Sequence, residues 1–261
     1  MERTHTPLSV WFWGAYLTAS HTAGMSATQF QRQLGLKRYE TAFQILHKLR
    51  AGMVRPDADR IGDQHGINHV EVDETWIGGA TRGEGSGNHN QTLVAAAIEV
   101  KQRKPKEGVK VRRGGRIAGR LRLQVVPNRG AKALVGFVQD AVLPGSMVVT
   151  DGWRVYQGIT ELGYQHLAAT ESGDAQVAEE YLPMVHLIFS NLKGWLRGCH
   201  HGVSPQHLQA YLNEFTFRFN RRFYPFNAFR SMLGIGGESQ APTYRELYSG
   251  EWEHPRAGAH G

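Results

Sequence analysis

The chain has 261 residues, enough for one catalytic α/β domain and a small additional module. Hydrophobic residues make up 41% of it, and neither a membrane-spanning apolar stretch nor a signal peptide is visible, so we expect a cytoplasmic protein. The single cysteine, Cys199, excludes an internal disulfide and any metal site built from several cysteines. The formal net charge of +7 favours an anionic partner such as nucleic acid, although solubility alone is a sufficient reason for it.

The first 56 residues have the pattern of a small helical module. Three short helices are predicted: the second begins at Ser26, whose spacing from Gln29 matches a capping box, and the third begins at Arg38. The side of the third helix that we expect to be exposed holds Arg38, Gln44, His47, Lys48 and Arg50. Two helices joined by a tight turn, the second with basic and amide side chains, are typical of a helix-turn-helix, but an ordinary three-helix bundle fits the pattern equally well.

Beyond residue 56 the hydrophobic period changes from that of helices to that of strands. Residues 57–67 are polar and predict a linker. In the segment that follows, NHVEVDETWIGG, apolar and polar residues alternate as in a strand. Further strands are predicted over 92–100, 120–126, 147–152 and 164–169, and helices over 130–142, 176–199 and 204–222. This order predicts an α/β catalytic domain over 68–235 and a C-terminal tail over 236–261.

A basic stretch separates the second and third predicted strands. Between Lys101 and Arg122 there are ten Lys or Arg residues and one Glu, together with glycines that suggest a flexible hairpin tip. The stretch is either a solvated loop or an arm that grips DNA phosphates, since each neutralised phosphate releases counterions. If it is an arm, we expect Arg112, Arg113 and Arg116 to contact DNA.

Two aspartates lie at or near the ends of predicted buried strands. Asp73 stands in VEVDET and Asp151 in VVTDG, and each follows β-branched residues. A carboxylate there is costly unless it is paired or bound to metal, although either aspartate alone is more often a turn or cap residue. As a pair on neighbouring strands they are suited to share Mg²⁺ or Mn²⁺, which prefer oxygen ligands and support phosphodiester chemistry.

The predicted helix over 176–199 has two distinct faces. Its apolar stripe contains Val185, Ile188, Leu192, Trp195, Leu196 and Cys199. His186, Ser190, Lys193 and Arg197 share another face, because they follow one another at helical spacing. That face offers a metal ligand, a hydroxyl and two cations, although a merely solvated polar face has the same pattern.

Several longer motifs resemble a known family. They are PLSVWFWGAYL, SATQFQRQLGL, YETAFQILHKLR, VEVDETWIGG, VTDGW, SNLKGWLRG, HHGVSPQHLQAYLNEFTFRFNRR and FNAFRSMLGI. They span about residues 7–235 and are similar to the ISXO-like transposases, the insertion-sequence family numbered 1595. The resemblance implies an RNase H-like mixed sheet flanked by helices, preceded by the small helix-turn-helix-like module. It also implies a DDE-type enzyme that cuts DNA at terminal inverted repeats and joins the 3′ ends to target DNA.

The family's catalytic triad is Asp, Asp and then Glu or Asn, with a lysine seven residues beyond. The resemblance assigns the first two positions to Asp73 and Asp151, and the lysine to Lys193. Seven residues before Lys193 stands His186, so a histidine takes the third ligand position. Imidazole is a poorer ligand for Mg²⁺ than carboxylate and suits Mn²⁺ better, so the enzyme is either a working Asp-Asp-His variant or a weakened one. The reserve candidate for the third ligand is Asn191, followed by Glu179 and Glu180.

The same resemblance sets the expected partners: double-stranded DNA, no membrane, and further copies of the chain assembled on DNA at the nucleoid. The expected DNA contacts are Arg38, Lys48, Arg50, Arg112, Arg113, Arg116, Arg197, Arg218, Arg221 and Arg222. Family members usually carry a cysteine-rich zinc ribbon before the first helix, and this chain starts where that ribbon would end. Two alternative functions stay open: a catalytically impaired or repurposed DNA-binding protein, and an RNase H-like hydrolase or resolvase without a joining step.

Overall fold

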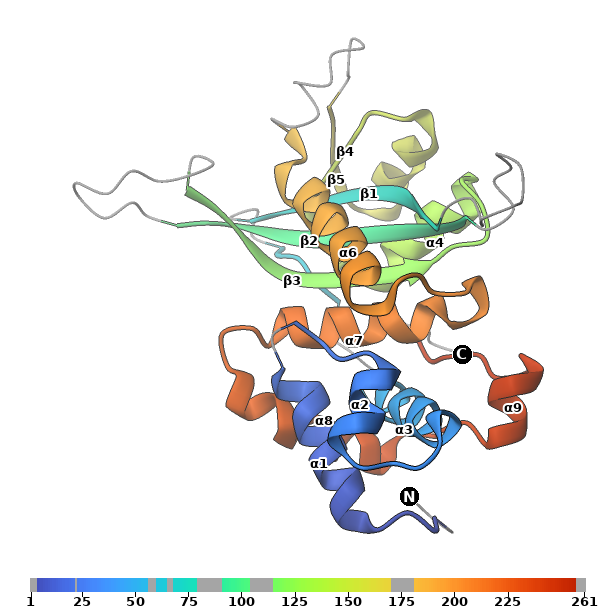
Figure 1. The fold of residues 1–261 in the computed structure, drawn as a ribbon. Coiled ribbons are helices and arrows are strands. Elements are labelled where there is room, and N and C mark those ends of the chain that lie inside the picture. The colour runs from blue at the N-terminus through green and yellow to red at the C-terminus, as the bar shows by residue number, and fades with distance from the viewer. Residues whose placement is uncertain are drawn as a thin grey trace. The chain divides into compact units, whose positions relative to one another are not determined.

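The structure is a computed structural model that describes residues 4–21, 23–55, 60–64, 68–78, 91–103, 115–169 and 181–256. Two compact units divide the chain (Figure 1). We call Met1–Pro56 with Gly194–Arg256 the helical unit, and Asp57–Lys193 with Ala257–Gly261 the sheet unit. The predicted domain limits, 1–56, 57–67, 68–235 and 236–261, rest on sequence pattern and stay predictions.

The elements agree in type with the predicted order. The helical unit contains α1 (Leu8–Ser20), α2 (Ala27–Gln33), α3 (Tyr39–Ala51), the 3₁₀ helix η4 (Pro205–His207), α7 (Leu208–Asn220), α8 (Pro225–Glu238) and α9 (Tyr244–Ser249). The sheet unit contains β1 (His69–Ile77), β2 (Thr92–Gln102), β3 (Arg116–Val125), α4 (Ala131–Ala141), β4 (Met147–Thr150), the 3₁₀ helix η3 (Arg154–Leu162) and β5 (Gln165–Ala168). Helix α6 (Pro183–His200) is divided between the units at Lys193. It begins later than the helix predicted from residue 176.

The sheet has the strand order β3-β2-β1-β4-β5. β1, β2 and β3 pair antiparallel, whereas β4 pairs parallel to β1 and β5 parallel to β4. β1 therefore lies at the centre, where the antiparallel and parallel parts of the sheet meet. This arrangement confirms the predicted α/β class, a mixed RNase H-like sheet flanked by helices with a helical region at the N-terminus.

Side chains alternate between the two faces of the sheet, and different helices pack on each face. On one face Val70, Val72 and Val148 pack with α4 and η3 into a continuous apolar core that also includes Phe137 and Tyr156. On the other face lies the first half of α6, which Figure 1 draws in front of the strands, with α4 behind them. β1 thus presents residues 70, 72 and 74 to the core of α4 and η3, and residues 71, 73 and 75 to α6.

The carboxylate of Glu71 fixes the start of α6 on the sheet. Glu71 is fully buried, and its Oε2 accepts hydrogen bonds from the backbone N–H groups of Met184 and Val185, both 2.8 Å long. The first N–H groups of a helix have no partner within the helix, and a negative charge there interacts favourably with the helix dipole. One side chain of β1 therefore satisfies two donors of the first turn and fixes that turn on the sheet.

The helical unit contains two separate small cores. Phe30, Ile45 and Leu46 form one between α2 and α3, while Ala15, Phe217 and Met232 belong to another that joins α1, α7 and α8. The predicted cap at Ser26 is confirmed, because its Oγ accepts from the backbone N–H of Gln29 at 3.2 Å. Helices α8 and α9 were not among the predicted elements; α9 lies in the segment 236–261 that was expected to be a tail.

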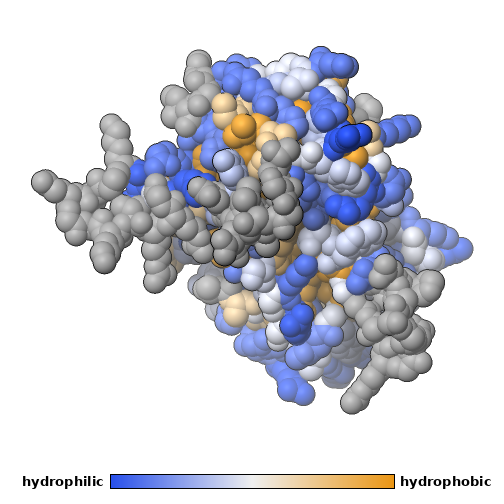
Figure 2. Space-filling model, turned by 90° about the horizontal axis from the view of Figure 1, so that it is seen from above, coloured by the Kyte–Doolittle hydropathy of each residue, from blue (hydrophilic) through white to orange (hydrophobic). Residues whose placement is uncertain are grey.

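Within the described residues, every helix is too short or too polar to cross a membrane. Figure 2, which views one face, shows hydrophilic side chains over most of the described surface, with smaller hydrophobic patches among them.

We predict that replacing Glu71 lowers the stability of the sheet unit. In Glu71→Ala two buried N–H groups lose their acceptor, which costs about 2–4 kcal/mol in the free energy of unfolding. Glu71→Gln keeps one acceptor oxygen but removes the charge, so we expect a smaller loss of about 1 kcal/mol. Urea unfolding followed by circular dichroism measures both. Glu161→Ala, an exposed carboxylate of η3, is the matched control and should stay within about 0.5 kcal/mol of the parent. An alanine variant as stable as the parent would show that Glu71 does not anchor α6.

Candidate active site

Two contacts join the exposed part of β1 to the polar face of α6. Nε2 of His186 lies 3.3 Å from Oδ2 of Asp73, and Nζ of Lys193 donates to Oγ1 of Thr75 at 2.8 Å. The side chain of His186 is 36% exposed and that of Asp73 is 13% exposed, so solvent reaches the pair. His186 therefore lies next to the first predicted aspartate, Asp73. Lys193 contacts Thr75, which stands two residues further along β1 on the same face.

The second predicted aspartate lies at the end of the neighbouring strand. β1 and β4 are parallel, their last pair is Glu71 with Val149, and Asp73 and Asp151 each stand two residues beyond that pair. Oδ1 of Asp151 accepts from the backbone N–H of Trp153 at 3.0 Å, which fixes the carboxylate in the turn after β4. Asp73 is held in a similar way, since its Oδ1 accepts from the backbone N–H of Glu74 at 2.8 Å.

The buried side chain of Tyr156 is hydrogen-bonded to Glu74 and interacts electrostatically with both aspartates. The hydroxyl of Tyr156 donates to Oε2 of Glu74 at 2.7 Å. Burial raises the pKa of Tyr156 far above its ordinary value, and the charges of Glu74, Asp73 and Asp151 raise that pKa further, because each disfavours a phenolate nearby. Tyr156 therefore stays protonated and serves as a fixed hydrogen-bond donor beneath the two aspartates.

Glu74 links β1 to the turn that carries Asp151. Its Oε1 accepts from Nε and the terminal nitrogen of Arg129, at 2.9 and 2.6 Å. The Arg129 guanidinium in turn lies 4.2 Å from the ring centre of Trp153. Sequence reasoning missed Glu71, Glu74, Arg129 and Tyr156. The signal for the two glutamates was present in VEVDET, where carboxylates occupy strand positions that burial makes costly without partners.

The donor set of this region fits a divalent cation. Two carboxylates that each stand two residues beyond the last β1–β4 pair, with an imidazole beside one of them, are ligands that Mn²⁺ accepts, and Mg²⁺ accepts the carboxylates. Among the described residues, the group of three possible ligands whose atoms all lie within 4.8 Å of one another is a different one, His47, His207 and His254 in the helical unit. The assignment of Asp73, Asp151 and His186 as metal ligands stays a prediction.

Of the reserve candidates for a third ligand, Asn191 alone lies in the described part of the chain. Asn191 is exposed on α6 and stands five residues after His186, which turns it away from the face that carries His186 and Lys193. Glu179 and Glu180 lie outside the described residues.

Two side chains of α3 that the sequence predicted to be exposed, Arg50 and His47, are buried. Arg50 is 1% exposed, and its Nε donates to Oε2 of Glu214 at 2.8 Å, while its guanidinium lies 3.9 Å from the ring centre of Tyr211. His47, placed on the same exposed side by the sequence, is also fully buried. Neither side chain is presented to DNA, because α7 and the segment after α9 supply their partners. Arg38 is exposed and Lys48 half-buried.

The remaining basic candidates differ in how far they are engaged within the protein. Arg197 is exposed. Arg218 contacts Glu214 and donates to the backbone carbonyl of His21. Arg221 and Arg222 stack on Phe217 and Phe219, each with its guanidinium 3.9 Å from the ring centre, and partial burial lowers the pKa of both.

The basic stretch is described only in part. Arg112 and Arg113 lie outside the described residues, and Arg116 is the first residue of β3. Arg120 of the same strand forms an ion pair with Glu99, with a terminal nitrogen 2.7 Å from Oε1. This pair lowers the pKa of Glu99, against the effect of its burial. Part of the positive charge of the stretch is therefore neutralised within the sheet.

Comparison with known proteins identifies the family of the chain. The model of the ISXO2-like transposase domain matches residues 65–220, more than half of the chain and the whole of the region that carries Asp73, Asp151 and His186. An uncharacterized transposase-like protein of Haemophilus influenzae (strain ATCC 51907 / DSM 11121 / KW20 / Rd) is 27% identical over 96 residues, which cover 37% of this chain and 77% of that protein. No solved structure matches. The chain belongs to the ISXO2-like transposase domain family.

Proposed function

We propose that the chain is the transposase of an insertion sequence, which cuts DNA at terminal inverted repeats and joins the freed 3′ ends to target DNA by metal-dependent phosphoryl transfer. The observation that carries the proposal is the contact of His186 with Asp73, beside a strand whose register leads to Asp151. Family membership supports the same function and favours it over a DNA-binding protein without catalysis.

Asp73, Asp151 and His186 would hold Mg²⁺ or Mn²⁺. Such ions, when bound, activate the attacking hydroxyl and stabilise the leaving oxygen in phosphodiester chemistry. The carboxylates of Asp73 and Asp151 are each oriented by a backbone N–H, so neither needs to reorganise before it can act as a ligand. His186 would offer the lone pair of a neutral ring nitrogen, in place of the harder oxygen of a carboxylate.

Lys193 has the role of a fixed cation in this proposal. Its hydrogen bond to Thr75 holds the ammonium group on the strand face that also carries Asp73. An ammonium there would contact a DNA phosphate next to the reacting one and orient the strand. Glu71 and Glu74 act through other residues: Glu71 positions α6 and with it His186, and Glu74 positions the turn after β4 through Arg129 and Tyr156.

The proposed partner is double-stranded DNA, bound by copies of the chain that assemble on it in the cytoplasm at the nucleoid. Among the described candidates for DNA contacts, Arg38 and Arg197 are exposed, and Lys48 and Arg116 are half-buried. Arg112 and Arg113 remain candidates from the sequence.

We predict that His186 controls the choice of metal. His186→Ala should lower cleavage and strand transfer about 100-fold or more, because a ligand is lost, while DNA binding changes little. His186→Glu should restore activity and raise the ratio of Mg²⁺-supported to Mn²⁺-supported activity, because a carboxylate is the harder ligand. The assay uses DNA ends read from the sequence that flanks the gene, with each metal in turn. Asn191→Ala, an exposed change on the same helix, is the control and should behave as the parent.

The same assay distinguishes the alternative functions. Asp73→Asn and Asp151→Asn should each abolish cleavage and joining. Cleavage without joining by the parent would indicate a hydrolase or resolvase, and an inactive parent that still binds the ends would indicate a DNA-binding protein. A His186→Ala variant that cuts as well as the parent would remove His186 from the ligand set.

We also predict that the basic stretch binds DNA without regard to sequence. Replacing Arg112, Arg113 and Arg116 with alanine should weaken binding to any duplex. The slope of log affinity against log salt should fall by up to about 0.9 for each phosphate that the variant no longer neutralises. Binding measured at several salt concentrations gives the slope. Arg50→Lys serves as a comparison, since a buried arginine should leave the slope unchanged. An equal slope for the triple variant and the parent would contradict this prediction and indicate that the stretch is a solvated loop.

A further inference from the structure

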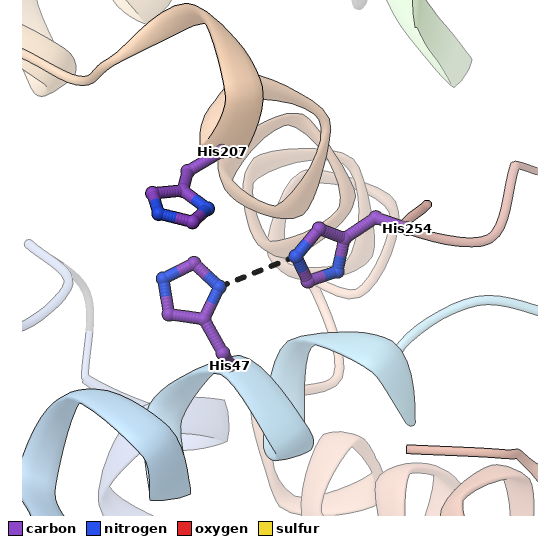
Figure 3. A group of neighbouring side chains, drawn as sticks. All are labelled: His47, His207 and His254. Carbon is purple, nitrogen blue, oxygen red and sulfur yellow. Dashed lines mark hydrogen bonds between the residues drawn. The ribbon is translucent and has the colours of Figure 1, made fainter. Parts of the chain in front are cut away.

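Three histidines from distant parts of the chain meet in the helical unit. His47 belongs to α3, His207 ends η4, and His254 lies in the segment that follows α9 (Figure 3). Each offers a ring nitrogen, and the three nitrogens lie within 4.8 Å of one another. His47 and His254 are buried, and His207 is half-buried. The site is separate from the one assigned to DNA chemistry, and it plays no part in the function proposed above.

The spacing of the nitrogens suits a metal ion. Nδ1 of His47 and Nε2 of His254 lie 3.3 Å apart and face each other (Figure 3). Two nitrogens bound to one tetrahedral zinc ion, at about 2.0–2.1 Å each, are also separated by ~3.3 Å. Three imidazoles and one open position is a ligand arrangement that zinc accepts in proteins. The separation of the His47 and His254 nitrogens therefore matches that of two ligands of one ion.

Most ring nitrogens of the cluster have a hydrogen-bond partner, and one buried N–H has none within the described residues. The indole N–H of Trp252 donates to Nδ1 of His254 at 3.3 Å, so His254 carries its own proton on Nε2 and donates it to Nδ1 of His47. His47 then carries its proton on Nε2, which is buried and has no hydrogen-bond partner within the described part of the chain. Burying such a group costs about 1–3 kcal/mol, and this cost is the same whether or not Nδ1 of His47 holds an ion.

Burial disfavours the charged form of all three rings. Burial, followed by the charge of Arg50, lowers the pKa of His47 and of His207. Burial lowers the pKa of His254 to about 4, with smaller effects from His207 and Arg50. Neutral imidazole is the ligand form, so metal binding need not displace a proton from the site at neutral pH. The positive charge that faces the cluster, Arg50, is offset by its ion pair with Glu214.

The cluster can be reached from solvent through His207. This residue also lines a cavity of about 610 Å³, together with residues of α2, the turn after α6 and Tyr211. This cavity lies next to the one histidine of the cluster that is half-buried.

We propose that His47, His207 and His254 bind one transition-metal ion of the zinc type, which fastens η4 and the segment after α9 to α3. Because the ion needs the lone pair on Nε2 of His254, the proton of that ring moves to Nδ1. The indole N–H of Trp252 then faces another donor and turns away. Metal binding should therefore change the environment of Trp252.

Binding of Co²⁺ alone, in place of zinc, tests the site on the full chain. We expect one equivalent to bind with the strong visible absorption of a tetrahedral site, and Zn²⁺ to displace it. His207→Gln, which alters a half-buried side chain, should lower the affinity at least about tenfold and remove the visible bands. His5→Gln removes an exposed histidine of the same unit and should leave both unchanged.

Two further variants distinguish this site from the proposed active site and test the role of Trp252. Asp73→Asn combined with Asp151→Asn should bind the first equivalent of Co²⁺ as the parent does, because neither aspartate belongs to the histidine cluster. Trp252→Phe removes the competing donor, so it should bind at least as tightly and lose the change in tryptophan fluorescence. Absence of the visible bands in the parent, or equal binding by His207→Gln, would overturn the proposal and leave the histidines as part of the packed core.

Discussion

The position of α6 depends on one buried carboxylate. Glu71 of β1 accepts from two backbone N–H groups of the first helical turn, and this contact leaves little freedom in how the helix lies on the sheet. Once the first turn is fixed, the helical period places His186 over Asp73 and Lys193 over Thr75. The ligand geometry proposed for the active site is thus a consequence of a capping interaction that itself touches no substrate.

β1 connects the two halves of the site because both of its faces carry charge. Glu71 and Asp73 point toward α6, whereas Glu74 points into the opposite core and meets Arg129 and Tyr156. A buried carboxylate without partners is costly; here Glu71 finds its donors on α6, and Glu74 finds its donors in Arg129 and Tyr156. The central place of β1 in the sheet lets a single six-residue motif, VEVDET, position α6 on one side and the turn after β4 on the other.

Short-range sequence patterns predicted much of this structure. The features that they missed depend on contacts between residues far apart in the sequence. The alternation in β1, the cap at Ser26 and the polar face of α6 are short-range signals, and each was sufficient to place its element. Arg50 and His47 were wrongly expected on the surface, because their partners Glu214 and His254 stand 164 and 207 residues away in the sequence. No periodicity within α3 reports which distant helix covers its polar side. The histidine cluster could not be predicted for the same reason.

The division of the helical unit between the two ends of the chain bears on how the protein is made. Arg50 and His47 leave the ribosome early, but the residues that bury them are synthesised only after the entire sheet unit. Domains tend to fold as they are synthesised. The sheet unit can therefore fold before α7 and the segment after α9, which pack on α3, have been made. During that interval the side of α3 that carries Arg50 and His47 is not yet covered by its partners.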